Sequence, residues 1–368
     1  MIERLRRNGI EVVECHERLW HGIEDRVHVA RGGLFNPSFW WRVFRTYVRL
    51  LQRYRQIGEY DMLMVGYPGH LDVLLARLLS WKRHKPLVWD ILMSIYLIAA
   101  DRGISEHLPS MWLMRQLERI ACHLPDLLIM DTEEYARWFQ STYGVSRDRF
   151  CFVPLGADDS VFVPLTSTAA PNDDVFRVIY YGTFIPNHGV QYIIEAAHLL
   201  VEERDIHFEF IGMGPDKAWA EDAAKRYRLT NVTFVDWLEP AELVERLARV
   251  DVCLGAFGLA HQSRLTVHNK IYEGLAMGKP VITGDSPAVR EIFEHGKQVY
   301  LCARGDPHSL AEAIRVLRRD KDLRQTLSRG GQACFHARFS MNALGLVLKR
   351  HLIELTNNQA VAEARPTL

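Results

Sequence analysis

A short stretch in the second half of the chain combines three cationic side chains with a single carboxylate. The segment SRLTVHNKI (263–271) holds Arg264, His268 and Lys270 and no acidic residue, and Glu273 follows in YEGLAMGKPVITG (272–284). Cations before a helix attract anions such as a diphosphate, and a carboxylate beside them can accept both hydroxyls of a ribose. For Glu273 alone, the alternative is an ordinary solvated helix glutamate.

The helix in this stretch supplies backbone donors. We expect it to begin near residues 266–268 and to end at Gly278, where Pro280 blocks its continuation. The first N–H groups of a helix have no partner inside the helix and form an anion site. The expected donors are the N–H groups of Val267, His268 and Asn269, with Thr266 at the helix start.

Short β-branched runs alternate with amphipathic segments along the chain, which predicts parallel sheets covered by helices. The predicted strands are 11–15, 61–67, 86–90, 126–131 and 149–154 in the first half, and 177–182, 207–212, 232–237, 252–257, 280–284 and 298–302 in the second. Ligands of such sheets collect at the carboxyl ends of the strands. Gly182, Gly212 and Gly214 stand at these ends, where glycine permits a close approach to the backbone.

Composition limits the function classes. With 368 residues, 48% hydrophobic and 24% charged, the chain is long enough for two globular domains. Lys+Arg and Asp+Glu number 45 each, which gives no general attraction to nucleic acid. The six cysteines show no metal-ligand spacing, so they are expected to be reduced thiols in the cores of the domains. Because no signal peptide or membrane span is recognisable, a cytoplasmic location is expected.

The expected domains are 1–157 and 175–339, joined by a linker at 158–174 that is rich in Pro, Ser, Thr and Asp. A C-terminal helix in 340–368 is expected to return toward the first domain and to end in a frayed tail. The chain opens inside a helix, so the first domain lacks its usual first strand, or the natural start lies earlier; we favour the second explanation because an empty central strand position leaves sheet edges unpaired.

The segment HNKIYEGLAMGKPVITGDSPAVREIFEHG resembles the donor-site pattern of retaining glycosyltransferases of the GT-B architecture, glycosyltransferase family 4-like or "group 1" in type. VPLGADDSVFVP and ARGDPHSLAEAI extend the resemblance. It implies an α/β fold of two Rossmann-like, doubly wound domains that face each other across a cleft. It also implies metal-free transfer of a sugar from a nucleotide sugar, UDP- or GDP-linked, to a glycan or lipid-linked acceptor, with retention of configuration.

The chain departs from the family pattern at two places. Many members carry a second acidic residue eight positions before the ribose-binding one, where this chain has Leu265. Many also carry an Arg and a Lys in the first loop of the second domain, where GTFIPNHG places Thr183 and His188. We therefore expect the diphosphate to depend more on Arg264, Lys270 and the helix N-terminus, with help from His188. Alternatives are a non-catalytic or truncated relative and a sugar-nucleotide epimerase on the same scaffold.

The first half is expected to bind the acceptor. His70 follows a Pro-Gly turn and Asp90 ends a strand. His70 would donate a hydrogen bond to substrate, and Asp90 would orient or deprotonate an acceptor hydroxyl. The alternative is that each caps the helix that follows it. The family reaction is pictured as a front-face transfer in which the donor phosphate takes the acceptor proton, so no protein nucleophile is assigned.

Seven arginines and no acid occur in residues 26–58, interleaved with aromatic residues. A basic helix at 38–57 with Arg42, Arg45, Arg49 and Arg53 on one face is typical of a peripheral contact with an anionic membrane. The protein would then act at the inner face of the cell membrane. The alternative is a solvated helix whose aromatic residues belong to the core.

Overall fold

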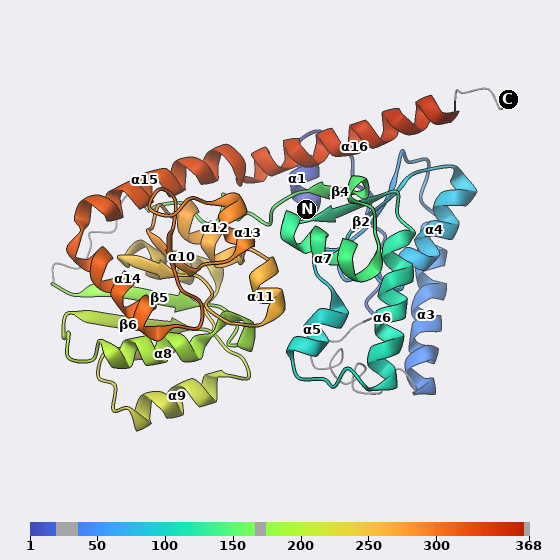
Figure 1. The fold of residues 1–368 in the computed structure, drawn as a ribbon. Helices are drawn as coiled ribbons and strands as arrows, with labels where there is room; N and C mark the ends of the chain where they lie inside the picture. The colour runs from blue at the N-terminus through green and yellow to red at the C-terminus, as the bar shows by residue number, and fades with distance from the viewer. Residues whose placement is uncertain (20–35, 166–173, 364–368) are drawn as a thin grey trace. The chain divides into compact units, whose positions relative to one another are not determined.

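The computed structural model describes residues 1–19, 36–165 and 174–363 (Figure 1). The chain divides into two compact units, Met1–Val153 together with Gly345–Leu368, and Pro154–Leu344. Both units are parallel α/β structures, as the sequence predicts. Part of the expected linker (166–173) and the end of the expected tail (364–368) lie outside the described residues.

The second unit is a doubly wound sheet of six parallel strands in the order β10-β9-β8-β5-β6-β7. From β5 the chain moves outward through β6 and β7, and it then returns to add β8, β9 and β10 on the other side. The direction of winding therefore reverses between β5 and β8, and the carboxyl ends at such a switch point are the usual ligand site of an open α/β sheet. The strands are β5 (Phe176–Tyr181), β6 (Ile206–Ile211), β7 (Val232–Val235), β8 (Val252–Leu254), β9 (Val281–Gly284) and β10 (Tyr300–Cys302).

Helices cover this sheet because its strands are buried on both faces and carry almost continuous apolar side chains. The core includes Val178, Phe208, Phe210 and Val252, each at most 1% exposed. The helices are α8 (Val190–Leu199), α9 (Lys217–Arg226), α10 (Pro240–Ala248), α11 (His261–Leu265), α12 (Asn269–Ala276), α13 (Pro287–Ile292), α14 (Pro307–Arg319) and α15 (Lys321–Arg338). The sequence analysis did not predict α11 and α15.

Two glycines bring the loops at the carboxyl ends of the strands into backbone contact. Gly189 has φ +68°, and a Cβ atom there would collide with the backbone of Phe257 and Gly258 in the loop after β8. Gly212 has φ +134°, and a Cβ atom there would collide with the carbonyl group of Gly182. Only glycine permits both the backbone conformation and the close approach. The loops after β5, β6 and β8 thus form one packed group.

The first unit contains four parallel strands in the order β1-β2-β3-β4, and the chain crosses the sheet in one direction. The strands are β1 (Leu63–Val65), β2 (Leu87–Asp90), β3 (Leu127–Met130) and β4 (Phe150–Phe152). No strand precedes β1 in the described part of the chain, so this sheet shows one half of a doubly wound arrangement. The strand predicted at 11–15 is therefore wrong: those residues are irregular, and no neighbouring strand offers them a ladder of hydrogen bonds.

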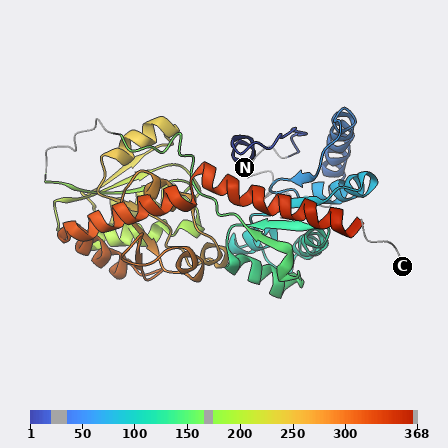
Figure 2. The same cartoon turned by 90° about the horizontal axis from the view of Figure 1, so that it is seen from above.

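The helices of the first unit are α1 (Ile2–Arg7), α3 (Pro37–Tyr54), α4 (Asp72–Arg83), α5 (Ile95–Asp101), α6 (Pro109–His123), α7 (Glu133–Tyr143) and most of α16 (Met341–Glu363). The helix predicted at 38–57 is α3, which begins after Asn36, whose side chain accepts a hydrogen bond from the Ser38 N–H. In both views α3 lies beside α4 (Figure 1, Figure 2). Within the described ranges, no helix is long and apolar enough to cross a membrane.

Candidate functional site

The candidate site lies at the switch point of the second sheet, where β5 and β8 end. The loop after β5 contains the short 3-10 helix η3 (Pro186–His188), and the loop after β8 leads through α11 into α12. These loops bring together Gly182, His188 and Lys270, which lie far apart in the sequence. The carboxyl-end position agrees with the expectation from the sequence.

Lys270 is the central residue of the site. Its side chain is only 5% exposed, and its Nζ atom lies 4.3 Å from the centroid of the Tyr180 ring. A Cβ atom at Gly182 would lie 3.5 Å from the same Nζ atom, so the lysine reaches across this glycine. Burial lowers the pKa of Lys270 to about 7, and the charge of Glu273 only partly opposes the shift. Within the described residues, no carboxylate forms an ion pair with Lys270.

Two histidines lie beside the lysine and are neutral. Burial lowers the pKa of His188 and of His268 well below the usual value, and the charge of Lys270 adds to the shift in both. Their ring centroids are 5.2 Å apart. The Nδ1 atom of His188 lies 2.6 Å from the Thr183 carbonyl oxygen and 3.2 Å from Lys270 Nζ. If this Nδ1 atom carries the ring hydrogen, it donates to the Thr183 carbonyl oxygen. It then cannot accept a hydrogen bond from Lys270 Nζ.

His268 carries an unsatisfied polar atom. Its Nδ1 atom is buried and has no hydrogen-bond partner in the described structure. A buried polar atom without a partner costs free energy, and such an atom beside a buried cation is typical of a site that a ligand completes.

Glu273 lies one turn after Lys270 on α12. Burial raises the pKa of its carboxyl group, while a hydrogen bond from the Tyr181 hydroxyl and the charge of Lys270 oppose the shift. The same Tyr181 hydroxyl lies 3.0 Å from the carbonyl oxygen of Lys270. The carboxylate is thus held by a neighbouring strand end and is not a freely solvated helix glutamate.

Helix α12 begins slightly later than the sequence predicts. Its first residue is Asn269 and its N-cap is His268, because Thr266 and His268 have extended backbones that separate α11 from α12. The unpaired N–H groups of the first turn therefore belong to Asn269 and Lys270, and Val267 lies before the helix, 1% exposed. The expected anion site would therefore lie at the same helix end, shifted by about one residue, and it remains a prediction.

The other predicted donor-site residues have different surroundings. Arg264, on α11, is exposed. Gly212 contacts the backbone of Gly182, and Gly214 contacts the backbone of Phe184, so both glycines pack loop against loop. These contacts explain why glycine is needed at both positions without a ligand, and a direct role in binding remains a prediction.

Arg304 is a residue of this site that the sequence analysis missed. Its Nη1 atom donates to the Gly258 carbonyl oxygen and to Ser263 Oγ, both at 2.9 Å, and its Nε atom donates to the Asp285 carbonyl oxygen at 3.2 Å. Ser263 Oγ in turn donates to the carbonyl oxygen of Asn187 at 2.5 Å. The arginine therefore ties together the loops after β5, β8 and β9.

The signal that could have identified Arg304 is its position, two residues after the last strand of the sheet. Burial lowers the pKa of its guanidinium to about 10. Its Nη2 atom is buried and has no partner among the described residues. Like His268 Nδ1, Arg304 Nη2 is a polar atom at the carboxyl edge that no described residue satisfies.

In the first unit, His70 belongs to a buried network. Its ring is 4% exposed, and its Nε2 atom lies 2.8 Å from Oε1 of Glu118, which is fully buried. Glu118 also accepts hydrogen bonds from Ser94 Oγ, the Ile95 N–H and the Tyr143 hydroxyl. The alternative that His70 caps α4 is wrong, because this helix has no side-chain cap. A substrate contact by His70 remains a prediction.

Asp90 ends β2 but does not cap the next helix, because Ser94 is the N-cap of α5. Burial raises the pKa of Asp90 to about 6, opposed by the ammonium group of Met1 and by Arg4. A carboxyl group with a pKa near neutrality can exchange a proton with a hydroxyl group. Its catalytic role remains a prediction.

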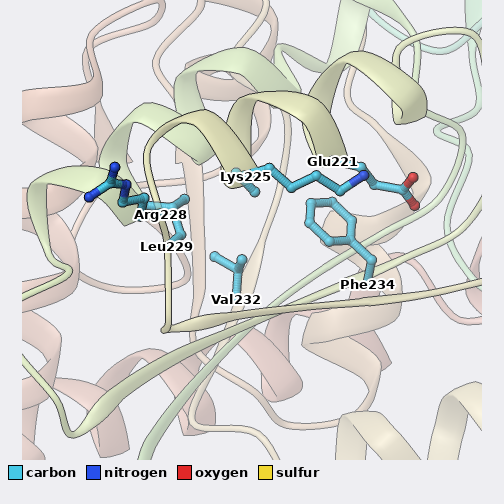
Figure 3. Close-up of a pocket in the computed structure, with 7 residues that line it drawn as sticks. Glu221, Lys225, Arg228, Leu229, Val232 and Phe234 are labelled. Carbon is cyan, nitrogen blue, oxygen red and sulfur yellow. The ribbon is translucent and has the colours of Figure 1, made fainter.

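A pocket of about 340 Å³ lies elsewhere in the second unit, between α9 and β7 (Figure 3). Val232, the first residue of β7, lines it together with Phe234, Lys225 and Arg228. The pocket thus lies toward the amino end of this edge strand, not at the switch point, and we assign no ligand to it. Among the described residues, no group of three or more His, Cys, Asp or Glu could hold a metal ion.

Residues 175–320 match the family model described as "Glycosyl transferases group 1". Over these residues, which lie in the second unit, the chain is similar to the group 1 glycosyltransferases. It is 28% identical over 172 residues to the lipopolysaccharide core biosynthesis glycosyltransferase LpsD of Rhizobium meliloti, across 46% of this chain and 47% of that protein. It is 24% identical over 174 residues to the alpha-D-kanosaminyltransferase of Streptomyces kanamyceticus, across 47% of this chain and 44% of that protein. The chain thus matches less than half the length of these curated relatives.

Solved structures show the same fold at low sequence identity. Sucrose-phosphate synthase from Thermosynechococcus elongatus superposes with a TM-score of 0.67 at 17% identity, covering 85% of this chain and 78% of that one. HepE from Anabaena, in complex with UDP-glucose, gives a TM-score of 0.64 at 18% identity, covering 83% and 82%. These likenesses confirm the GT-B type of fold expected from the sequence.

Arg304 should be a structural anchor of this site. We expect Arg304→Gln to lower the free energy of unfolding by about 2–3 kcal/mol, because hydrogen bonds from a buried charged donor to three acceptors are lost. The matched control is Arg290→Gln, which removes a guanidinium that is 63% exposed and paired with Asp285. Exposed pairs contribute about 1 kcal/mol or less. Urea denaturation measures both changes, and equal losses would contradict the anchoring role.

Proposed function

We propose that the chain transfers a sugar from a nucleotide sugar to a hydroxyl group of a glycan or lipid-linked acceptor, with retention of configuration. The observation that carries the proposal is the buried ammonium group of Lys270, which has no carboxylate in ion-pair contact within the described residues. A buried charge without a counter-ion is costly. A bound diphosphate would supply that counter-ion at the N-terminus of α12, where the helix dipole also favours it.

A UDP-linked donor is the proposed substrate, with a GDP-linked donor as the other expectation from the sequence. It is supported by the HepE structures, which are complexes with UDP and with UDP-glucose. The likeness to LpsD, named for lipopolysaccharide core synthesis, supports a lipid-linked or glycan acceptor and a place in polysaccharide or glycolipid synthesis. The sugar and the linkage are not assigned.

The proposed division of labour follows from the geometry. Lys270 and the N–H groups at the start of α12 would neutralise the leaving diphosphate, with His188 and His268 as neutral hydrogen-bonding groups beside it. Glu273 would accept the hydroxyls of the ribose. Arg264, which is exposed, would reach the diphosphate from α11. The bond from the anomeric carbon to the diphosphate would break as the acceptor oxygen bonds to the same face of that carbon. The acceptor proton would pass to an oxygen of the leaving diphosphate, so no protein nucleophile is needed.

A second reading is a relative that binds a nucleotide sugar without transferring it, or that epimerises it. Two observations support this second reading. Leu265, at the position where many family members carry an acid, is 7% exposed and belongs to the core. Thr183 stands where many members carry an arginine, and its carbonyl oxygen contacts His188.

Incubation with a panel of UDP- and GDP-sugars, with and without glycan and lipid-linked acceptors, tests these readings. Release of nucleoside diphosphate together with a glycosylated acceptor is the expected result. Interconversion of the sugar without acceptor would indicate an epimerase. Binding in calorimetry without product from any donor would indicate a non-catalytic relative.

Lys270 should couple nucleotide binding to proton uptake. The pKa of its free ammonium group is about 7, and a bound diphosphate stabilises the charged form, so the pKa is higher in the complex. Above pH 7 the lysine must therefore gain a proton to bind. The affinity for UDP should fall as the pH rises from 7 to 9, a window in which the diphosphate itself is already ionised.

Calorimetry at pH 8 in two buffers of different ionisation enthalpy counts the protons. We expect an uptake approaching about one proton per UDP bound, and uptake near zero for Lys270→Met, which cannot be protonated. Uridine, which lacks the diphosphate, serves as the control ligand. Equal proton uptake by the wild type and the variant would place the titrating group elsewhere.

Glu273 should contribute to binding of the nucleoside and not of the diphosphate alone. Glu273→Gln keeps the size of the side chain but removes the charge that strengthens its hydrogen bonds to ribose hydroxyls. We expect the affinity for UDP to weaken by about 1.5–3 kcal/mol, the contribution of hydrogen bonds to a charged group. Inorganic pyrophosphate should lose much less. Unchanged UDP affinity in calorimetry would exclude the ribose contact.

A further inference from the structure

Helix α3 exposes a strip of apolar side chains that do not take part in packing the helix against the core. Its inner side is held by Phe39, which is 4% exposed, and by Tyr47, whose hydroxyl donates to Asp72 of α4 at 2.6 Å. On the outer side, Trp41 is 62% exposed, Phe44 is 58% exposed and Val48 is 38% exposed. Their spacing of three and four residues places them on one face of the helix.

Trp41 and Phe44 are thus not part of the core. For these two residues, the alternative that the aromatic side chains of this helix belong to the core is wrong. Trp41 and Phe44 stack on each other with ring centroids 5.6 Å apart, outside the packed layer. The neighbouring helix α4 also exposes large apolar side chains, with Leu78 at 61% and Trp81 at 59%. Both helices belong to the first unit and lie side by side in both views (Figure 1, Figure 2).

Cationic side chains adjoin this apolar strip. Arg45 and Arg49 are exposed and make no ion pair within the described part of the chain. Arg45 lies one helical turn after Trp41, and Arg49 lies one turn after Arg45, so the two arginines lie along one edge of the strip. Arg53 does not belong with them as the sequence suggested, because its guanidinium lies 2.8 Å from Glu17 and donates to the His16 carbonyl oxygen.

We propose that this face of α3, formed by Trp41, Phe44, Arg45, Val48 and Arg49, docks on an anionic lipid bilayer. Tryptophan and phenylalanine bury their rings at the boundary between headgroups and acyl chains, while arginines remain at the level of the lipid phosphates. An apolar strip edged by unpaired cations is complementary to such a surface in both polarity and charge. An acidic protein surface would match the cations but not the extent of exposed aromatic area.

The proposal does not depend on the transferase reaction, because lipid binding is measured without substrate. It would give the protein reversible access to acceptors held in a membrane. The attachment is peripheral: two arginines and two rings form a weak anchor, and the charge contribution is screened over roughly 10 Å at 0.1 M salt.

Co-sedimentation of the full chain with vesicles tests the proposal. The probes are vesicles of phosphatidylcholine alone and vesicles of phosphatidylcholine in which about one third of the lipid is anionic phosphatidylglycerol. We expect binding to the anionic vesicles at low salt, and binding that is much weaker at high salt or on neutral vesicles. No binding to anionic vesicles at low salt would overturn the proposal.

Two double variants separate charge from aromatic insertion. Arg45→Gln with Arg49→Gln should reduce partition onto anionic vesicles on the order of 30-fold, the expected effect of two cations near the surface. Its control is Arg226→Gln with Arg329→Gln, two exposed arginines of the second unit. An equal loss in this control would mean that only net charge matters and would overturn the assignment to α3.

Trp41→Ser with Phe44→Ser should also reduce partition at least tenfold while the protein stays folded, since neither ring is in the core. The matched control is Leu346→Ser with Ile353→Ser on α16, which are 51% and 48% exposed. In a second readout, brominated lipid should quench part of the tryptophan fluorescence, and Trp41→Phe should remove much of that quenching. Unchanged quenching in Trp41→Phe would show that this face does not enter the bilayer.

Other occupants of the strip would give distinct results. A second copy of the chain would appear as a dimer in light scattering that Trp41→Ser with Phe44→Ser converts to a monomer. If the strip binds an anionic polysaccharide, the protein would bind that polysaccharide in solution and would not bind vesicles. Either result without vesicle binding overturns the bilayer proposal.

Discussion

The binding edge of the second unit depends on one buried lysine, Lys270, which has no carboxylate in ion-pair contact among the described residues. The ammonium group of Lys270 is almost removed from water, and its pKa falls to about 7. Burial of this kind is costly unless a ligand supplies the missing negative charge. Among the described residues, the neighbours of the lysine supply no counter-ion. His188 and His268 are neutral, and Glu273 shifts the pKa of Lys270 without forming an ion pair with it.

The stability of this arrangement comes from the loops around it. The ring of Tyr180 lies against Lys270 Nζ, and a cation over an aromatic face is stabilised even where water is scarce. Gly189 and Gly212 allow three loops to meet backbone to backbone, and Arg304 fastens three loops by hydrogen bonds to their carbonyl and hydroxyl oxygens. These contacts hold the loops in place without a ligand, and preorganised donors lose less entropy when they bind an anion.

The first unit shows a different use of buried charge. Glu118 is fully buried, and four donors, from His70, Ser94, Ile95 and Tyr143, satisfy its carboxylate. A buried charge whose hydrogen bonds are complete within the protein fixes local structure and needs no ligand. His70 is therefore part of the framework of the first unit, whatever it contacts through its remaining Nδ1 atom, which has no partner among the described residues. At the edge where the second sheet changes direction, His268 Nδ1 and Arg304 Nη2 are buried atoms without a partner among the described residues.

The sequence by itself determined the fold class, the strands of the second unit and the resemblance to group 1 glycosyltransferases. Alternating apolar runs and helix-forming segments have local causes, so β5 to β10 appear where they are predicted, with ends that differ by a few residues. The segment around Lys270 and Glu273 is contiguous in the chain, and its residue types and spacing were therefore visible directly. The start of α12 was placed about one residue early, because the extended backbone of Thr266 and His268 depends on packing against neighbouring loops.

Only the tertiary structure decided which side chains have partners. The contacts of Arg304 with Gly258 and Ser263 join residues more than forty positions apart, and no local pattern announces them. The predicted strand at 11–15 fails for a similar reason, since a strand requires a neighbour that supplies hydrogen bonds. On α3, periodicity revealed the amphipathic helix, but the sequence did not show that Trp41 and Phe44 lie outward or that Glu17 pairs with Arg53. Burial and pairing depend on segments distant in the chain, and the sequence pattern of one helix does not contain them.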